Sequence, residues 1–120
     1  MENRFIPKQY IPGVMSLVSK YRSSLLAIGK SPDSHVYDYR ESTFSANLRS
    51  PQRKFLRSVY RFYQSLKDET DQKIFLSEIL ERGRHYPFWH FGLMESSEYK
   101  QRVVRICTKT FRAFGIEVPA

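Results

Sequence analysis

The residues of this chain that could do chemistry are its arginines and lysines, whose side chains bind phosphate groups. The 120-residue sequence has 20 lysines and arginines against 12 aspartates and glutamates, which gives a formal net charge of +8. Eleven of the 20 lie in two stretches without an acidic residue, Arg49 to Lys67 and Tyr99 to Phe114. A basic excess located in this way favours a polyanionic partner, chiefly nucleic acid. A solvated face that keeps the protein in solution is the alternative explanation.

The first of these stretches has a regular spacing. Arg53, Arg57 and Arg61 are four residues apart, so on a helix they form one stripe. Like charges at this spacing repel each other by a few tenths of a kcal/mol per pair, roughly. Because no glutamate between the arginines relieves this repulsion, the stripe often indicates a functional role.

Other kinds of chemistry are not expected. The sequence has no P-loop, GxSxG or HExxH motif, so the chain is not predicted to be an enzyme. His85 and His90 lack the spacing of metal ligands, and the single cysteine, Cys107, falls on an apolar helix face, where a buried, inert thiol is expected. We therefore expect no metal site and no cofactor.

The composition also bears on location. A single cysteine excludes an intramolecular disulfide framework and fits a cytoplasmic protein. No apolar run approaches the ~20 residues of a membrane span, and the first residues lack the apolar core of a signal peptide. We expect a cytoplasmic protein with no membrane partner.

The elements that must position the basic residues are predicted to be helices. Apolar residues at spacings of three and four mark helices over residues 12–28 and 52–66, and Ser50 and Pro51 are start signals for the second. Asp68 or Thr70 could cap a third helix, which ends at Gly83. A short aromatic helix over residues 87–94 and a last helix over residues 98–114, capped by Ser96 or Ser97, follow. The predicted fold is all-α, with about five helices and no substantial sheet.

The first 50 residues are predicted to be a separate part of the chain. They contain the N-terminal helix and a long loop or arm rich in Ser, Asp, Asn and Pro, within which residues 35–39 form a short strand or simply a link. Residues 51–120 form the helical domain. The N-terminal helix is the expected interface of a homodimer, because so small a DNA-binding domain often gains specificity by dimerising.

The layout of residues 69–115 predicts a helix-turn-helix unit. In such a unit the last helix lies in the major groove and its N-terminal residues contact base edges. The predicted base contacts are Ser97, Glu98, Lys100, Gln101 and Arg102. The predicted contacts to the DNA backbone are Ser96, Arg84, Arg105, Lys109, Arg112, Arg53, Arg57 and Arg61.

A sequence pattern in the last third of the chain supports this layout. Ser96, Tyr99 and Arg102 form S-x-x-Y-x-x-R after an aromatic segment and a turn with serines, and a basic amphipathic tail ending in Phe114 follows. The pattern resembles the C-terminal end of sigma-region-4-like helix-turn-helix proteins, and in particular the small phage and Gram-positive regulators of the ArpU and RinA type. The resemblance implies a DNA-binding regulator of transcription.

The aromatic segment before the last helix supports a second hypothesis. Phe88, Trp89 and Phe91 are expected mainly in the core, where they would anchor the short helix between its neighbours. If Trp89 is exposed instead, the chain is a protein-interaction module that uses Tyr86 to Phe91 and the N-terminal helix as its surface, for example an accessory factor that docks on RNA polymerase or on a viral structural partner. RNA binding by the basic helices is a third hypothesis.

Overall fold

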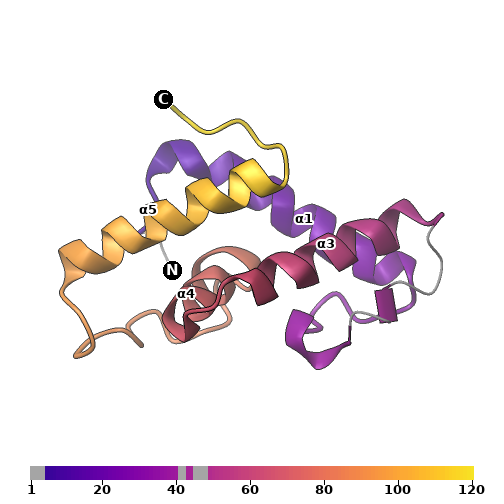
Figure 1. The fold of residues 1–120 in the computed structure, drawn as a ribbon, viewed down its shortest axis with the longest axis horizontal. Helices are drawn as coiled ribbons and strands as arrows, with labels where there is room; N and C mark the ends of the chain where they lie inside the picture. The colour runs from indigo at the N-terminus through magenta and orange to yellow at the C-terminus, as the bar shows by residue number, and fades with distance from the viewer. Residues whose placement is uncertain (1–4, 41–42, 45–48) are drawn as a thin grey trace.

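Four α-helices form the framework of the chain in the computed structural model, which describes residues 5–40, 43–44 and 49–120. They are α1 (Ile11–Ala27), α3 (Pro51–Ser65), α4 (Glu69–Ile74) and α5 (Ser96–Ala113), and Figure 1 shows their order. Two 3₁₀ helices, η1 (Lys8–Tyr10) and η2 (Val36–Asp38), and a π-helix, η3 (Phe75–Leu80), complete the set. None of the described residues forms a strand, so the all-α prediction is confirmed, with four α-helices where about five were predicted.

The sequence signals at the helix starts explain two of the boundaries. The hydroxyl of Ser50 accepts a hydrogen bond from the backbone N–H of Arg53 (3.2 Å), and Pro51 occupies the first turn of α3, where no backbone donor is needed. Of the two caps that the sequence left open for α4, the structure has Asp68, whose Oδ1 accepts from the backbone N–H of Thr70 at 2.8 Å.

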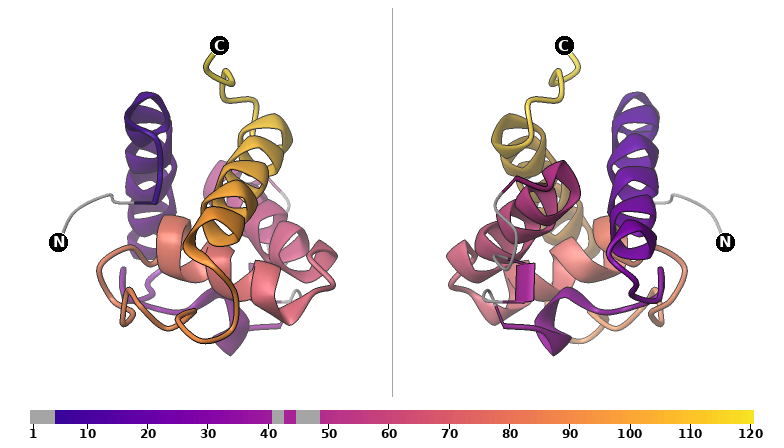
Figure 2. Two further views of the ribbon diagram at one scale, coloured as in Figure 1. Left: turned by 90° about the vertical axis from the view of Figure 1, so that its left-hand side faces the viewer. Right: turned by 90° about the vertical axis from the view of Figure 1, so that its right-hand side faces the viewer.

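The α4–η3 segment lies at the centre of the helix packing. α1 packs against α3 and η3 on one side, and α5 packs against α4 and η3 on the other. Figure 2 shows the segment between α1 and α5. Because it is covered from both sides, every residue of η3 except Ser77 is buried. This position explains why η3 departs from the one-sided apolar pattern of a surface helix.

α1 and the C-terminal end of α5 approach closely at Gly13. A Cβ atom at Gly13 would lie 2.6 Å from Cζ of Phe111, so only glycine fits there without a shift of the ring. Next to this point Tyr10 packs on Phe111, with ring centroids 5.4 Å apart, and its hydroxyl is 3.3 Å from Oγ1 of Thr108. α1 therefore belongs to the same packed core as α5.

The N-terminal part of the chain differs from its prediction in one respect. The short strand considered for residues 35–39 is wrong, because Val36–Asp38 form the 3₁₀ helix η2. The division of the chain at residue 50 stays a prediction, although Val14, Leu17, Tyr21 and Leu25 of α1 share one core cluster with the other helices. The outer side of α1 exposes Met15 and Leu26, and its role as a dimer interface also stays a prediction. In the described residues, no helix is both long and apolar enough to cross a bilayer.

Candidate nucleic-acid interface

The two acid-free stretches of the sequence form α3 and α5, and Phe114 joins them. Its ring packs against Phe55 and Phe62 of α3, with centroid distances of 5.8 and 5.7 Å. This contact holds the C-terminal end of α5 beside the middle of α3. Basic side chains on the outer sides of the two helices are therefore brought together.

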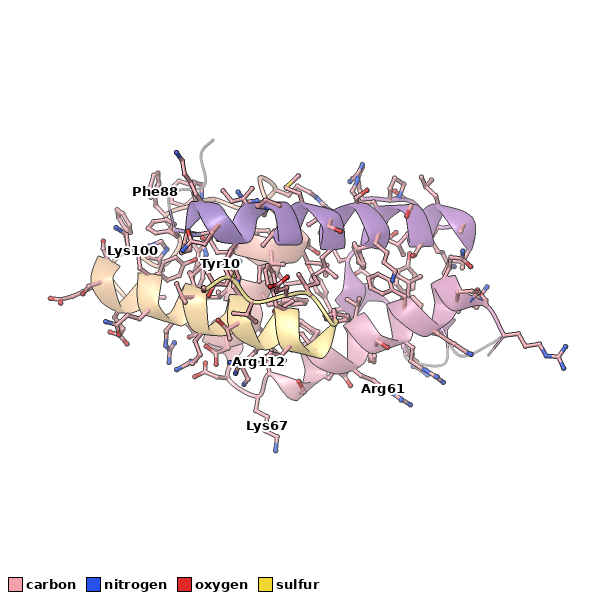
Figure 3. All side chains as sticks on the ribbon, turned by 90° about the horizontal axis from the view of Figure 1, so that it is seen from above. Tyr10, Arg61, Lys67, Phe88, Lys100 and Arg112 are labelled. Atoms are coloured by element: carbon pink, nitrogen blue, oxygen red, sulfur yellow. The ribbon has the colours of Figure 1, made fainter. Side chains whose placement is uncertain are left out.

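Four exposed cations from these helices and from the turn after α3 form what we call the basic face. They are Arg61, Lys67, Lys109 and Arg112. Figure 3 shows Arg61, Lys67 and Arg112 projecting from the same side of the molecule, away from α1. On α5, Lys109 and Arg112 share a side with Arg102 and Arg105, opposite the buried side that contains Val103, Ile106 and Thr110.

The other two arginines of this side of α5 are paired with acids before and within α4. Nη2 of Arg102 lies 3.5 Å from Oδ2 of Asp68, and Nη2 of Arg105 lies 3.2 and 3.3 Å from the two oxygens of Asp71. The backbone N–H of Thr70 and the charge of Arg102 lower the pKa of Asp68, so this carboxylate is ionised at neutral pH. One nitrogen of each of these arginines is therefore already engaged, and the paired carboxylate weakens the attraction of Arg102 and Arg105 for a phosphate.

The three arginines of α3 that were predicted to contact DNA also differ in their surroundings. Nη1 of Arg53 donates to the backbone oxygen of Thr43 at 2.6 Å, so this side chain holds the segment before α3. Arg57 is half-buried, whereas Arg61 is exposed. Arg84 also lies apart from the basic face, because its Nη2 donates to the backbone oxygen of Asp33 at 2.5 Å.

The first turns of α5 carry the other predicted DNA contacts. Ser96, Ser97, Glu98, Lys100 and Gln101 are all exposed, so nothing in the described residues covers them. The predicted serine cap is wrong: α5 begins at Ser96 after Glu95, and no side chain caps it. Because Glu95 and Glu98 place two carboxylates at this helix end, a phosphate there meets negative charge as well as backbone donors.

The predicted short helix of the helix-turn-helix unit is absent. Residues 87–94 form consecutive turns, with backbone hydrogen bonds from Trp89 to Tyr86, from Phe91 to Phe88 and from Leu93 to His90. Figure 1 shows this segment as a loop that leads to α5. The run of large rings, with Pro87 and Gly92 inside it, explains the departure, because Gly92 adopts a φ of 89° that a helix does not use. The structure therefore has the last helix of the predicted unit without the preceding one.

The core prediction for the aromatic segment holds for one ring and fails for another. Trp89 packs against the core, and its Nε1 donates to Oγ of Ser77 at 3.0 Å. Phe91 is exposed, with 58% of its surface accessible, and the prediction of a core position for it is wrong. Phe88 is half-buried.

Two buried glutamates next to the aromatic segment escaped the sequence analysis. Glu81, just after η3, is fully buried; its two oxygens accept from Nδ1 of His35 and from Nε2 of His85, both at 2.6 Å. Glu78 accepts from the hydroxyl of Tyr99 at 2.7 Å. The four-residue spacing of Glu81 and His85 could have indicated one of these bonds. His35 lies in a loop that is distant in the sequence, and no sequence pattern indicated its bond to Glu81.

The remaining candidate groups have structural roles. Nη1 of Arg82 donates to the backbone oxygen of Glu78 at 2.9 Å, so this side chain satisfies a carbonyl near the end of η3. Cys107 is buried as predicted, and burial raises the pKa of its thiol to about 12, so the thiolate is not populated at neutral pH. In the described residues, no group of three or more His, Cys, Asp or Glu side chains could hold a metal ion.

Comparison of the chain with known proteins finds no relative. Neither the protein-family models, nor the curated proteins, nor the solved structures contain a match to it. The resemblance to helix-turn-helix regulators therefore stays a prediction, and the function must be argued from the surface itself.

Proposed function

We propose that this protein binds duplex DNA through the basic face. The observation that carries the proposal is the gathering of Arg61, Lys67 and Arg112 on one side of two packed helices. Lys109, three residues before Arg112 on α5, shares that side of the helix. A rigid array of cations from two elements can follow a phosphate backbone, which supplies most of the affinity of non-specific DNA binding. A face of merely solvated charges does not require the two helices to present their cations on the same side.

Readout of bases by the start of α5 is the second part of the proposal. Ser97, Glu98, Lys100 and Gln101 are exposed and of the types that contact base edges. Arg102 and Arg105 are weakened for this role by their pairs with Asp68 and Asp71. Regulation of transcription, which the resemblance implies, would require this readout in addition to the backbone contacts.

The proposal is tested by removing two cations of the basic face and measuring binding to a labelled duplex by fluorescence anisotropy at several salt concentrations. Four phosphate contacts predict that log affinity falls with log salt at a slope of about −4, and the double variant R61Q/R112Q should reduce that slope by about 2. Its affinity at low salt should fall roughly tenfold or more.

The matched control is the double variant K8Q/R40Q. Lys8 and Arg40 are exposed and lie outside the basic face, on η1 and after η2, and their loss changes the net charge by the same amount. Equal losses for both double variants would show that overall charge, not the basic face, governs binding. Competition with structured RNA decides between DNA and RNA as the preferred duplex.

A second candidate function rests on the aromatic segment. Tyr86, Phe91 and Leu93 are exposed, as a protein-interaction module requires. In that case the chain docks on a protein such as RNA polymerase without reading DNA. Wild-type protein that shows no salt-dependent affinity for duplex DNA would favour this second candidate.

A further inference from the structure

His90 is completely buried, and neither nitrogen of its ring has a hydrogen-bond partner among the described residues. Its ring lies flat on that of Tyr99, with centroids 3.4 Å apart and planes inclined by 1°. The rings of Phe5, Trp89 and Phe91 meet it edge to face, at centroid distances of 4.9, 5.7 and 5.0 Å. We call Phe5, Trp89, Phe91 and Tyr99 the aromatic cage. Buried polar side chains usually have a partner, so a histidine in such a cage requires an explanation.

The other two histidines of the chain have the opposite surroundings. His35 and His85 each lie 2.6 Å from an oxygen of the buried Glu81, so a proton added to either ring meets a carboxylate. The aromatic cage offers His90 no such acceptor. An imidazolium inside the cage loses its hydration, and attraction to the ring faces offsets only part of that loss. Burial accordingly lowers the pKa of His90 below its ordinary 6.5.

The titratable groups around the cage lie on the elements that pack against it. On α5 the hydroxyl of Tyr99 donates to Glu78 of η3 at 2.7 Å, and Glu78 forms no hydrogen bond with His90. Lys73 of α4 lies over the Trp89 ring, 5.7 Å from its centroid, and its charge disfavours a second cation nearby. The ring from the N-terminal segment is uncharged. Burial raises the pKa of Glu78, so protonation of Glu78 affects stability in the opposite direction to protonation of His90.

His90 also occupies the point where three parts of the chain meet. Its own loop, residues 86–94, joins η3 to α5. Phe5 comes from the N-terminal segment and packs on both His90 and Tyr99, at 4.9 Å from each ring centroid. Within the loop, the backbone N–H of Leu93 donates to the backbone oxygen of His90 at 3.0 Å. The His90 ring therefore holds the loop and the N-terminal segment against the start of α5.

We propose that His90 is a pH-sensitive switch: its protonation favours a conformation in which the ring has left the aromatic cage and the loop of residues 86–94 has opened. In the open loop His90 is in water and takes up a proton near pH 6.5, whereas in the closed loop the ring stays neutral. The opening equilibrium therefore shifts toward the open loop as the pH falls below 6.5, by up to about tenfold per pH unit. Opening does not require DNA, so this switch is independent of the proposed function.

The test measures amide hydrogen exchange of the full-length protein between about pH 7.5 and about pH 4.5. The reporter is the backbone amide of Leu93, because its hydrogen bond to His90 breaks when the loop opens. Its protection factor, corrected for intrinsic exchange, should fall by up to about tenfold per pH unit below pH 6.5. NMR titration of the His90 ring should show that it is still neutral below pH 6.5.

Substitutions assign the effect to His90. His90→Phe keeps an aromatic ring in the cage but cannot take up a proton, so Leu93 protection should no longer depend on pH. His90→Leu serves the same purpose if the larger phenylalanine ring disturbs the fold, which circular dichroism checks. The matched control is His35→Gln, which removes another imidazole but keeps a donor for Glu81, and it should retain the full dependence. In Glu78→Gln the opposing titration is absent, so the dependence should be at least as steep.

Each of the other results overturns the proposal. A His90 ring that titrates at or above pH 6.5 would show that the ring faces stabilise the imidazolium. Leu93 protection that does not change with pH would show that the loop opens without releasing the ring. A dependence that His90→Phe and His90→Leu retain would belong to another group, and one that His35→Gln removes would belong to the pair at Glu81.

Discussion

The charged side chains at the centre of this molecule are buried, whereas those of the basic face are exposed. Glu78 and Glu81 are buried, and their carboxylates accept hydrogen bonds from Tyr99, His35 and His85 on other parts of the chain. The cations of the basic face are exposed on one side of two helices. A buried charge is stable only with partners, whereas an exposed charge costs little. The comparison teaches that the central carboxylates depend on their partners in the fold, whereas the surface charges lie where a ligand can reach them.

The largest effect that this comparison predicts is on stability, at Glu81. Replacing Glu81 with alanine leaves two imidazoles without their acceptor and detaches the loop that carries His35. We expect the free energy of unfolding to fall by about 3 kcal/mol, as when one partner of a buried pair is removed. Urea unfolding followed by Trp89 fluorescence measures it.

The matched control for Glu81 is the exposed Glu69 at the start of α4. Its replacement by alanine should cost well under about 1 kcal/mol, because only an interaction with the helix dipole is lost. Equal costs for the two variants would contradict the distinction between central and surface charges.

The pH dependence of stability tests the distinction between central and surface charges at Glu78. Burial raises the pKa of its carboxyl above the ordinary 4.5, and the hydrogen bond from Tyr99 and the charge of Arg82 only oppose that rise. The folded state therefore binds this proton more tightly than the unfolded chain does. As pH rises through the folded-state pKa, the carboxyl loses its proton inside the protein, and this contribution to stability is lost.

The stability of the variant Glu78→Gln should therefore depend less on pH above the ordinary pKa of 4.5, and the variant should be the more stable of the two once the wild-type carboxyl is ionised. The glutamine oxygen still accepts from Tyr99, so the packing is kept. Unfolding curves across this range, with the exposed Glu117→Gln as control, provide the measurement. A variant that is less stable than the wild type at every pH would show that the ionised carboxylate itself is needed.

The helices were predictable because the spacing of apolar residues within each one indicates which of its sides is buried. The spacing of apolar residues predicted the last helix, and the six buried residues of α5, from Tyr99 to Phe111, recur at intervals of one, three and four residues; Asp68 was one of two predicted caps. Spacing alone reports which face is apolar, so it could not show that η3 is covered on both sides. The pairing of Glu81 with His35 spans 46 residues and depends on tertiary packing, which no local pattern contains.

The candidate site was only partly predictable for a related reason. The two basic stretches were visible in the sequence, but which cations are already engaged depends on neighbours in space. Asp68 and Asp71 appeared only as signals for the start of α4, yet they also pair with Arg102 and Arg105 on α5. The missing short helix reflects the aromatic segment, in which Trp89 and His90 pack inward and Tyr86 and Phe91 lie outward along a series of turns.

The smallest predicted effect comes from releasing one arginine of α5 from its acid partner. Asp71→Asn removes the acid partner of Arg105, whose side chain is 54% exposed. Because such a pair contributes at most about 1 kcal/mol, stability should change little. Arg105 lies on the same side of α5 as Lys109 and Arg112, so once released it can contact a phosphate. The affinity for duplex DNA should rise a few-fold, and the salt slope should become more negative by about 1.

Asp38→Asn is the control for this change, because Asp38 is exposed on η2 and its loss adds the same unit of charge. It should change neither the slope nor the affinity beyond the weak effect of net charge, which salt screens over distances of about 10 Å. If both variants strengthen binding equally, Arg105 is not part of the contact surface even when it is released. If only Asp71→Asn strengthens binding, Asp71 at present limits how much of α5 the DNA can contact, and the basic face extends from Arg112 toward the start of that helix.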